Sequence, residues 1–478
     1  MDNQPSRPSY WLTRFVILRL LGAVYAVAFL VAINQLVPLV GAHGLLPAGL
    51  FLQEVRSAGE GFVQLPTLFW WGHSDTALLT VSWTGFLLSM IVVAGFANAP
   101  LLGVLWFLYM SIVNIGQDWY GYGWEIQMLE TGFLAIFLCP LVEARPFPRR
   151  EPPFQVIVLF RWLILRIMLG SGLIKLRGDK VWTHWTALYY HFETQPIPGP
   201  LSRWFHFLPR LVLRIGVWYN FLAELVAPWF VFFPRPWRHS AGVIIVLLQI
   251  VLIFSGNLSF LNWLTIIPAL ACFDDSFWAR LLPRALVRKA EAARDAAQPS
   301  RAMQVTAWVL TVVIALFSIQ PVLNLLSNEQ VMNASFDPLD LVNTYGAFGS
   351  VGQERFNVVF EGSRDSVTWT PYPYKGLPVA PDKRPPQIAP YQLRLDWQMW
   401  FAAMATPDEY PWTYTLVSRL LRGDPGAVSL FAGNPFPGQP PRYIRAILYR
   451  YRFAPPGDSL WWRRDRLGIW IPATSLHE

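Results

Sequence analysis

The stretch FVILRLLGAVYAVAFLVAINQLVP, residues 15–38, decides the class of this protein. A helix needs about 20 predominantly apolar residues to cross the hydrocarbon core of a bilayer, and this run is long enough. It is too long for the apolar core of a signal peptide, and no small-residue cleavage site follows it. The run therefore predicts a retained first membrane helix.

The composition of the whole chain extends this interpretation. Of 478 residues, 54% are hydrophobic and only 14% are charged, whereas a soluble protein carries about a quarter charged residues. The 24 Trp and 17 Tyr fit aromatic belts at the two membrane interfaces. We expect a multi-pass helical bundle with about nine spans, each of roughly the length that crosses a bilayer. These spans are residues 15–38, 76–96, 101–115, 128–142, 154–176, 211–233, 241–256, 259–273 and 303–326.

Positive charge orients the expected spans, because cytoplasmic loops carry an excess of Lys and Arg. Every predicted inside segment is basic except the tight turn near Asn98, and the inside set places the N-terminus in the cytoplasm. An odd number of spans then puts the segment after Leu326 outside the cytoplasm, in the endoplasmic reticulum lumen or the bacterial periplasm. The basic residues assigned to the inside are Arg7, Arg14, Arg145, Arg149, Arg150, Arg235, Arg238, Arg280, Arg284, Arg288, Lys289, Arg294 and Arg301.

Two domains follow from this topology: a transmembrane helical domain, 1–326, and an extracytoplasmic domain, 327–478. FNVVFEGSRDSVTWTPYPY, residues 356–374, reads as a hairpin, and RYIRAILYRYRF, residues 442–453, reads as a half-buried strand. Two segments between them, 391–404 and 413–423, have helical patterns. The second domain is therefore predicted to be mainly β with added helices and a Pro-rich loop from Pro371 to Pro390.

The outside loops are long and rich in Trp, Tyr, His and Gly, so function is expected on the outer face. Several long strings in and after these loops resemble the lipase maturation factor family, from about residue 10 to the C-terminus and in the family's order. The strings are GSGLIKLRGDKVW (170–182), LYYHFETQPIPGPLS (188–202), NTYGAFGSV (343–351), RLDWQMWFAAM (394–404), NPFPGQPPRYIRA (434–446), LYRYRF (448–453) and WWRR (461–464).

This resemblance implies a multi-pass protein of the endoplasmic reticulum membrane that helps secreted lipases fold and assemble into active dimers. Its partners would be secreted lipase-like clients and the lipid bilayer, and it would be a chaperone rather than an enzyme. A bacterial member would lie in the inner membrane, and its client need not be a lipase. Nucleic acid is not expected as a partner, because no Lys/Arg-rich segment with interleaved aromatic residues stands apart from the membrane. No cofactor is expected either.

A second, more distant resemblance links the membrane half to the horizontally transferred transmembrane domain of vitamin K-dependent carboxylases. It implies a membrane enzyme with a site around Lys175 on the outer face. The catalytic candidates are then Lys175, whose pKa partial burial would lower, with Glu130, His184 and His191. A transporter ranks last, because polar residues at mid-span are few.

Ionisable residues inside membrane spans are costly and often functional. Arg166 and Glu224 lie near the middle of their expected spans and are predicted to form a buried ion pair. Lys175 and Glu130 lie near outer ends and could pair there, unless Lys175 extends to the interface and Glu130 stabilises a helix N-terminus. No metal site is expected, since His184 and His191 lack a zinc-binding motif.

GQDWYGYGWEIQMLETGFLAIF, residues 116–137, places Gly, aromatic and acidic residues against an apolar run. The simplest interpretation is an ordinary turn at the membrane boundary. Its position on the same face as the Lys175 loop instead predicts one functional surface. We expect this surface to comprise Asp118, Trp124, Glu125, Glu130, Lys175 and Trp182.

Overall fold

The computed structural model describes residues 8–476, so Arg7 of the predicted inside set lies outside the described residues. Within them, six helices are long and apolar enough to cross a membrane, by length and composition. They are α1 (Trp11–Val40), α3 (Asp75–Ala94), α6 (Phe154–Arg177), α10 with its continuation (Arg210–Phe232), α11 (Arg235–Ser255), and α15 with α16 (Arg301–Leu326).

The other three expected spans are helical but shorter. They are α4 (Ala99–Ile115), α5 (Gly123–Ile136), and α12 (Leu261–Ala269) with the 3₁₀ turn Leu270–Cys272. The 14 residues of α5 would rise only about 21 Å as an α-helix, less than the hydrocarbon thickness of about 30 Å. The expected number of nine spans is therefore not confirmed, whereas the membrane bundle itself is.

Close packing of small residues joins the first two long helices. A Cβ atom at Gly22 of α1 would lie 2.9 Å from Val92 of α3, and Gly85 of α3 lies directly against the ring of Phe29. The Ser74 hydroxyl accepts a hydrogen bond from the Ala77 amide and begins α3. Small residues at such contacts let helix backbones approach closely without a solvent-driven hydrophobic effect.

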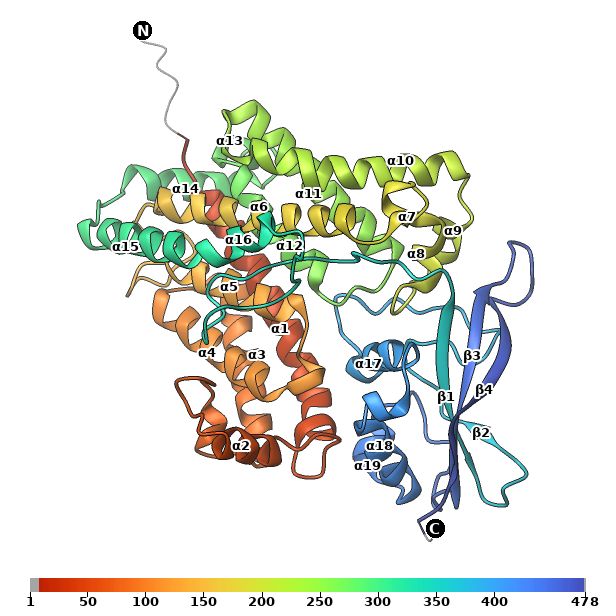
Figure 1. The fold of residues 1–478 in the computed structure, drawn as a ribbon. Helices are drawn as coiled ribbons and strands as arrows, with labels where there is room; N and C mark the ends of the chain where they lie inside the picture. Colours follow the sequence, from red (N-terminus) through yellow and green to blue (C-terminus); the bar gives the residue numbers. More distant parts are fainter. Residues whose placement is uncertain (1–7, 477–478) are drawn as a thin grey trace.

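Short helices occupy the segments between the long ones. Near one end of the bundle lie α13 (Asp275–Trp278) and α14 (Arg284–Asp295), and near the other lie α2, α7, α8 and α9 (Figure 1). These last four span Ala48–Ser57, Lys180–Thr183, Leu188–Thr194 and Ser202–His206. α10 proper spans Arg210–Phe221 and continues through a π-helical turn, Leu222–Val226.

One end of the bundle gathers segments far apart in sequence. The Arg14 guanidinium donates to the Arg150 carbonyl at 2.8 Å, and the Asp275 carboxylate accepts from the amides of Trp11 and Leu12. Arg238 forms an ion pair of 2.9 Å with Asp274. These residues all come from segments that the charge pattern assigns to the inside, so we name this the basic end.

The C-terminal sheet lies beside the opposite end (Figure 1). It is antiparallel, in the order β2-β1-β3-β4. The strands are β1 (Arg355–Ser363), β2 (Thr370–Pro371), β3 (Tyr443–Phe453) and β4 (Trp462–Thr474). The pairing of β1 with β2 and the extent of β3 confirm the predicted hairpin and strand, and residues 372–390 form no helix or strand, as expected for the Pro-rich loop.

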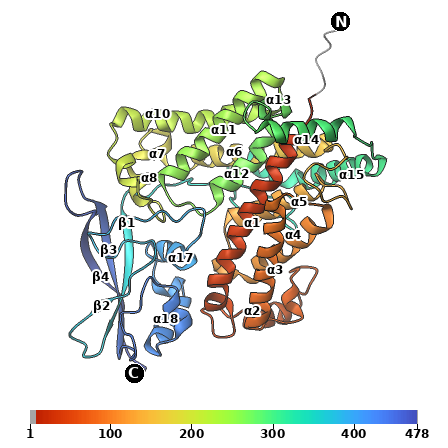
Figure 2. The ribbon, with the colours of Figure 1, turned by 180° about the vertical axis from the view of Figure 1, so that it is seen from behind.

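Three helices fill the space between this sheet and the bundle, as both views show (Figures 1 and 2). They are α17 (Arg394–Ala402), α18 (Trp412–Leu421) and α19 (Pro425–Ser429). The first two confirm the predicted helical segments. Because α17 packs toward the bundle and the sheet packs behind it, one buried layer of side chains connects the two halves of the chain.

Candidate functional site

A buried polar contact joins the bundle to α17. Arg394 forms an ion pair of 3.0 Å with Glu125, and neither side chain is exposed to solvent. Its guanidinium lies 3.3 Å from the centre of the Tyr120 ring and donates to the Trp119 carbonyl. A buried charge needs both a counter-ion and hydrogen bonds, and Arg394 receives both from the segment that begins at Gly116.

Amide side chains extend this contact to α1. The Gln35 amide nitrogen donates to the Gln392 carbonyl at 2.7 Å, and its oxygen accepts from the Arg394 amide at 2.9 Å. The Trp124 indole donates to Glu125 at 3.0 Å and to the Gln392 side chain at 3.2 Å. We name Gln35, Trp124, Glu125, Gln392 and Arg394 the outer junction.

Asp118 lies at the edge of the outer junction, where the Gln398 side chain donates to its backbone carbonyl. Partial burial raises the pKa of the Asp118 carboxyl above its usual value. On the same helix as Gln398, burial raises the pKa of Asp396 to about 6, although the amides of Gly376 and Leu377 donate to it at 2.6 and 3.0 Å. The desolvation of this carboxylate therefore outweighs its two hydrogen bonds.

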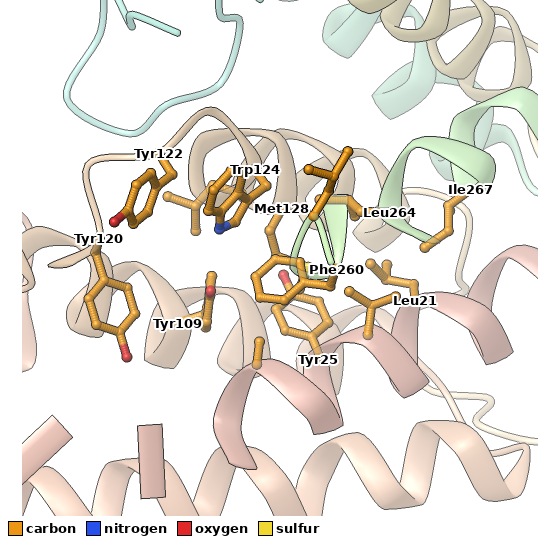
Figure 3. Close-up of a cluster of buried hydrophobic side chains, with 14 of the residues drawn as sticks. Leu21, Tyr25, Tyr109, Tyr120, Tyr122, Trp124, Met128, Phe260, Leu264 and Ile267 are labelled. Atoms are coloured by element: carbon orange, nitrogen blue, oxygen red, sulfur yellow. The ribbon is translucent and has the colours of Figure 1, made fainter. Parts of the chain in front are cut away.

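A cavity of about 290 Å³ lies between α5, α6, α12 and α17, next to the outer junction. Aromatic side chains form much of its wall: Trp124 stacks on Tyr122 with ring centres 4.4 Å apart and meets Trp397 edge-on at 4.8 Å. Figure 3 shows Tyr122 and Trp124 side by side, with Tyr120 and Tyr109 nearby. We name this the aromatic cavity.

Glu130 is buried in the centre of a second polar cluster. Its carboxylate pairs with Arg166 and accepts from the Asn343 amide at 3.1 Å and the Tyr345 hydroxyl at 2.7 Å. The Arg166 guanidinium also donates to the Asn343 carbonyl at 2.8 Å. The cluster therefore attaches the segment that follows the last long helix to the interior of the bundle.

Lys175 belongs to a third cluster. Its ammonium lies 2.5 Å from the Glu224 carboxylate and 4.9 Å from the centre of the Trp182 ring. Asn220 donates to the second carboxylate oxygen of Glu224 at 2.8 Å. These residues and His191 line a small cavity of about 70 Å³, which we name the lysine cavity.

His191 and His184 differ in their surroundings. Burial, with a smaller contribution from the Lys175 charge, lowers the pKa of His191 to about 4, so its imidazole is neutral at pH 7. His184 is exposed and does not line the lysine cavity. The structure therefore separates these two catalytic candidates, and it holds Lys175 in an ion pair.

The predicted partners of the buried charges are exchanged. Arg166 pairs with Glu130 instead of Glu224, and Lys175 pairs with Glu224 instead of Glu130. α5 begins at Gly123, so Glu130 lies two turns inside its helix and not at the outer end. α10 packs on α8, where Gly216 contacts Leu188, and Glu224, in the π-helical turn after α10, lies beside Lys175.

The six residues of the predicted functional surface fall into three groups. Asp118, Trp124 and Glu125 lie at the outer junction, Glu130 lies with Arg166, and Lys175 and Trp182 line the lysine cavity. Apart from Asp118 they are buried, so they do not form one exposed surface.

Sequence reasoning missed three partners: Gln35 in α1, Gln392 just before α17, and Arg394 at the start of α17. A signal was present, since Arg394 and Asp396 interrupt an otherwise apolar and aromatic helix pattern. Buried charged residues of this kind are rare without partners. What the sequence could not supply was the pairing of Arg394 with a residue 269 positions earlier.

The chain was compared with known proteins. Residues 12–280 match the lipase maturation factor transmembrane domain, and residues 341–472 match the lipase maturation factor C-terminal domain. No solved structure matches the chain. The comparisons do not support the resemblance to vitamin K-dependent carboxylases.

Relatives match over nearly the full length. Lipase maturation factor 1 of Bos taurus is 46% identical, over 100% of this chain and 92% of that protein. The human protein of the same name is 43% identical, over 98% of this chain and 89% of its own length. Lipase maturation factor 2 of Rattus norvegicus is 30% identical, over 95% of this chain and 82% of that protein. The chain, an integral membrane protein, therefore belongs to the lipase maturation factor family.

Proposed function

We propose that this protein is a membrane-bound factor for the folding and assembly of secreted lipase-like clients. The observation that carries the proposal is the order and extent of the family similarity. Both halves match their respective family domains, and the identity to lipase maturation factor 1 reaches 46% with no large part of the chain left out. The membrane bundle and the C-terminal domain are therefore expected to work together in one role.

The proposed location is the endoplasmic reticulum membrane, with the N-terminus in the cytoplasm and the C-terminal domain in the lumen. The contacts at the basic end support this orientation. Arg14 contacts Arg150 there, and Arg238 pairs with Asp274, which directly precedes α13. Figure 1 shows α13 and α14 at the end of the bundle away from the C-terminal sheet. A basic cluster at one end of a membrane bundle marks its cytoplasmic side.

The proposed client contacts lie on the outer end. Trp71 is 73% exposed and Trp204 is 61% exposed, and both belong to loops that the charge pattern assigns to the outside. Arg203, the neighbour of Trp204, donates to the Pro455 carbonyl in the β3–β4 connection, so this aromatic residue lies beside the C-terminal domain. Exposed aromatic groups of this kind suit transient contact with apolar client surface.

A rescue assay tests the proposal. Cells lacking lipase maturation factor 1 would express a secreted lipase with this protein, with an empty vector, or with the control variant Glu54→Ala, at an exposed position of α2. We expect the protein and the control to raise lipase activity per mass of secreted lipase well above the empty-vector level. Secreted lipase that stays inactive in the presence of correctly localised, folded protein would contradict the proposed function.

A further inference from the structure

The aromatic cavity has a composition that defines its ligand. None of the residues that line it is Asp, Glu, Lys, Arg or His. A buried ionic group would find no counter-ion there, and burying one without a partner is costly. At about 290 Å³, the volume approaches the range of about 300–1,000 Å³ that is typical of small-molecule sites. The cavity therefore suits an uncharged, mainly apolar group.

Two hydrogen-bond donors in the wall, the Tyr122 hydroxyl and the Trp397 indole, have no acceptor within residues 8–476. The indole of Trp124 donates to Glu125, that of Trp400 donates to the Thr194 carbonyl at 2.9 Å, and the Gln127 amide donates to Thr265 at 3.1 Å. Trp397 is only 4% exposed, and within residues 8–476 its indole nitrogen has no hydrogen-bond partner. An unpaired buried donor costs free energy that a ligand oxygen would recover.

The position of the cavity further limits the chemical class of its ligand. Its wall combines Ile167 and Ser171 of the membrane helix α6 and Leu261 of α12 with Trp397 and Phe401 of α17. The cavity thus connects the membrane bundle with the C-terminal domain. A site between a membrane bundle and a domain outside the membrane is expected near the membrane surface. In a bilayer, the lipid ester groups lie at that level, between the hydrocarbon core and the aqueous phase.

The aromatic cavity lies next to the lysine cavity, which holds the buried Lys175–Glu224 pair. The aromatic cavity and the lysine cavity share Ile167, Ser171, Leu258, Leu261, Ala347 and Phe348 in their walls. An elongated apolar chain could therefore extend along α6 beyond the aromatic residues. The polar Lys175–Glu224 pair then limits how far a hydrocarbon chain reaches.

We propose that the aromatic cavity binds one acyl chain of a glycerolipid, with its ester carbonyl accepting a hydrogen bond from Trp397. The chain fills the space between the bundle and α17, while the headgroup stays outside the uncharged cavity. This bound lipid strengthens the attachment of the C-terminal domain. The proposal concerns a ligand of this chain and does not depend on the identity of any client.

Photolabelling tests the proposal without any measurement of lipase activity. The purified full-length protein would be placed in nanodiscs containing phosphatidylcholine with a diazirine on one acyl chain, irradiated, and mapped by mass spectrometry. Labelling of peptides that contain Trp397 and Phe401 would be divided by labelling of Leu87, which is 58% exposed on α3. This ratio separates a specific site from general lipid contact.

Two kinds of variant should reduce this labelling ratio by different amounts. Ser171→Leu and Ala347→Leu fill the cavity and should each reduce the ratio about tenfold, as loss of the available volume predicts. Trp397→Phe keeps the apolar wall and should reduce it about threefold, the effect of one lost hydrogen bond. The same Trp397→Phe change should not alter labelling by a diazirine-bearing alkane that has no ester.

A control substitution outside the cavity checks that these effects are specific to the cavity. Ile91→Phe, at another exposed position of α3, should leave the cavity labelling unchanged. Unaltered labelling in the cavity-filling variants, or equal effects of Trp397→Phe on the ester and alkane probes, would overturn the proposal. Should a filling variant fail to fold, the Trp397→Phe comparison alone decides.

Discussion

Two buried ion pairs of the bundle, Glu130–Arg166 and Lys175–Glu224, have the same chemistry and different surroundings. Glu130 and Arg166 are 1% and 2% exposed, and both also form hydrogen bonds with the segment that contains Asn343 and Tyr345. Lys175 and Glu224 instead face the lysine cavity, with Asn220 as their main polar neighbour. The first pair connects two parts of the chain, whereas the second leaves space beside it.

This difference suggests different roles. A buried charge that loses its only counter-ion is strongly destabilising, because the protein cannot replace the lost interaction. A charge beside a cavity can recover part of the loss by admitting water. We therefore interpret Glu130–Arg166 as structural, and the Lys175 cluster as the more adaptable region.

The largest effect is expected from breaking the first pair. Glu130→Ala leaves Arg166 without a carboxylate and removes the acceptor of Tyr345, so the free energy of unfolding should fall by about 3–5 kcal/mol. Unfolding by SDS in micelles, followed by Trp fluorescence, measures this change. Glu54→Ala, at an exposed glutamate of α2, is the matched control and should change it little. A loss below about 1 kcal/mol for Glu130→Ala, the value of a surface ion pair, would contradict the structural role.

Breaking the second pair should cost less. Lys175→Met leaves Glu224 with Asn220 and a cavity that can hold water, so we expect a loss of about 2–3 kcal/mol. The double variant Lys175→Met/Glu224→Leu removes both charges and should recover most of this loss in the same assay. If Lys175→Met costs as much as Glu130→Ala, or if the double variant recovers nothing, the contrast between the two pairs is wrong.

The pH dependence of stability reports on the C-terminal side of the contact. Burial raises the folded-state pKa of Asp396 to about 6, above its unfolded value of 3.8. The neutral carboxyl is favoured in the folded protein, so its stabilisation is complete below the unfolded pKa and is lost as pH rises through the folded pKa. Relative to Asp396→Asn, the wild type should lose about 2 kcal/mol between about pH 4 and pH 6. Parallel stability curves for the two proteins over this window would show that burial does not raise this pKa.

The smallest effect concerns the link from α1 to the outer junction. Gln35→Ala removes the acceptor of the Arg394 amide and the donor to the Gln392 carbonyl, which should cost about 1–2 kcal/mol. Hydrogen exchange of the α17 amides should become faster to a corresponding degree. Asn34→Ala, at the exposed neighbouring position, is the control and should leave α17 exchange unchanged.

Most of the architecture could be predicted from composition and periodicity. Apolar length identified the six long helices, and alternating aromatic and Arg residues identified β3. The number of spans could not be predicted, because α5 and α12 are apolar yet short, and a hydropathy pattern alone does not separate a short buried helix from a membrane span.

The candidate site was harder to predict, for a physical reason. The sequence identified Arg166, Glu224, Lys175 and Glu130 as unusual, because charges inside apolar helices need partners. It could not assign those partners, because depth was read from position along each expected span. α5 begins at Gly123 and not at residue 128, which places Glu130 deeper than expected. The span of Glu224 matches the expected one, so its contact with Lys175 depends on how the helices pack in three dimensions.

We propose that this family member contacts its clients on the outer end, where the C-terminal domain also lies. Photoreactive benzoylphenylalanine placed at Trp71 or Trp204 tests it directly in cells that secrete a lipase, with Leu281, 64% exposed near the basic end, as the control position. We predict cross-links to newly made lipase from Trp71 and Trp204 and none from Leu281. Cross-links from Leu281 alone, or equally from all three positions, would contradict the proposed location of the client contacts.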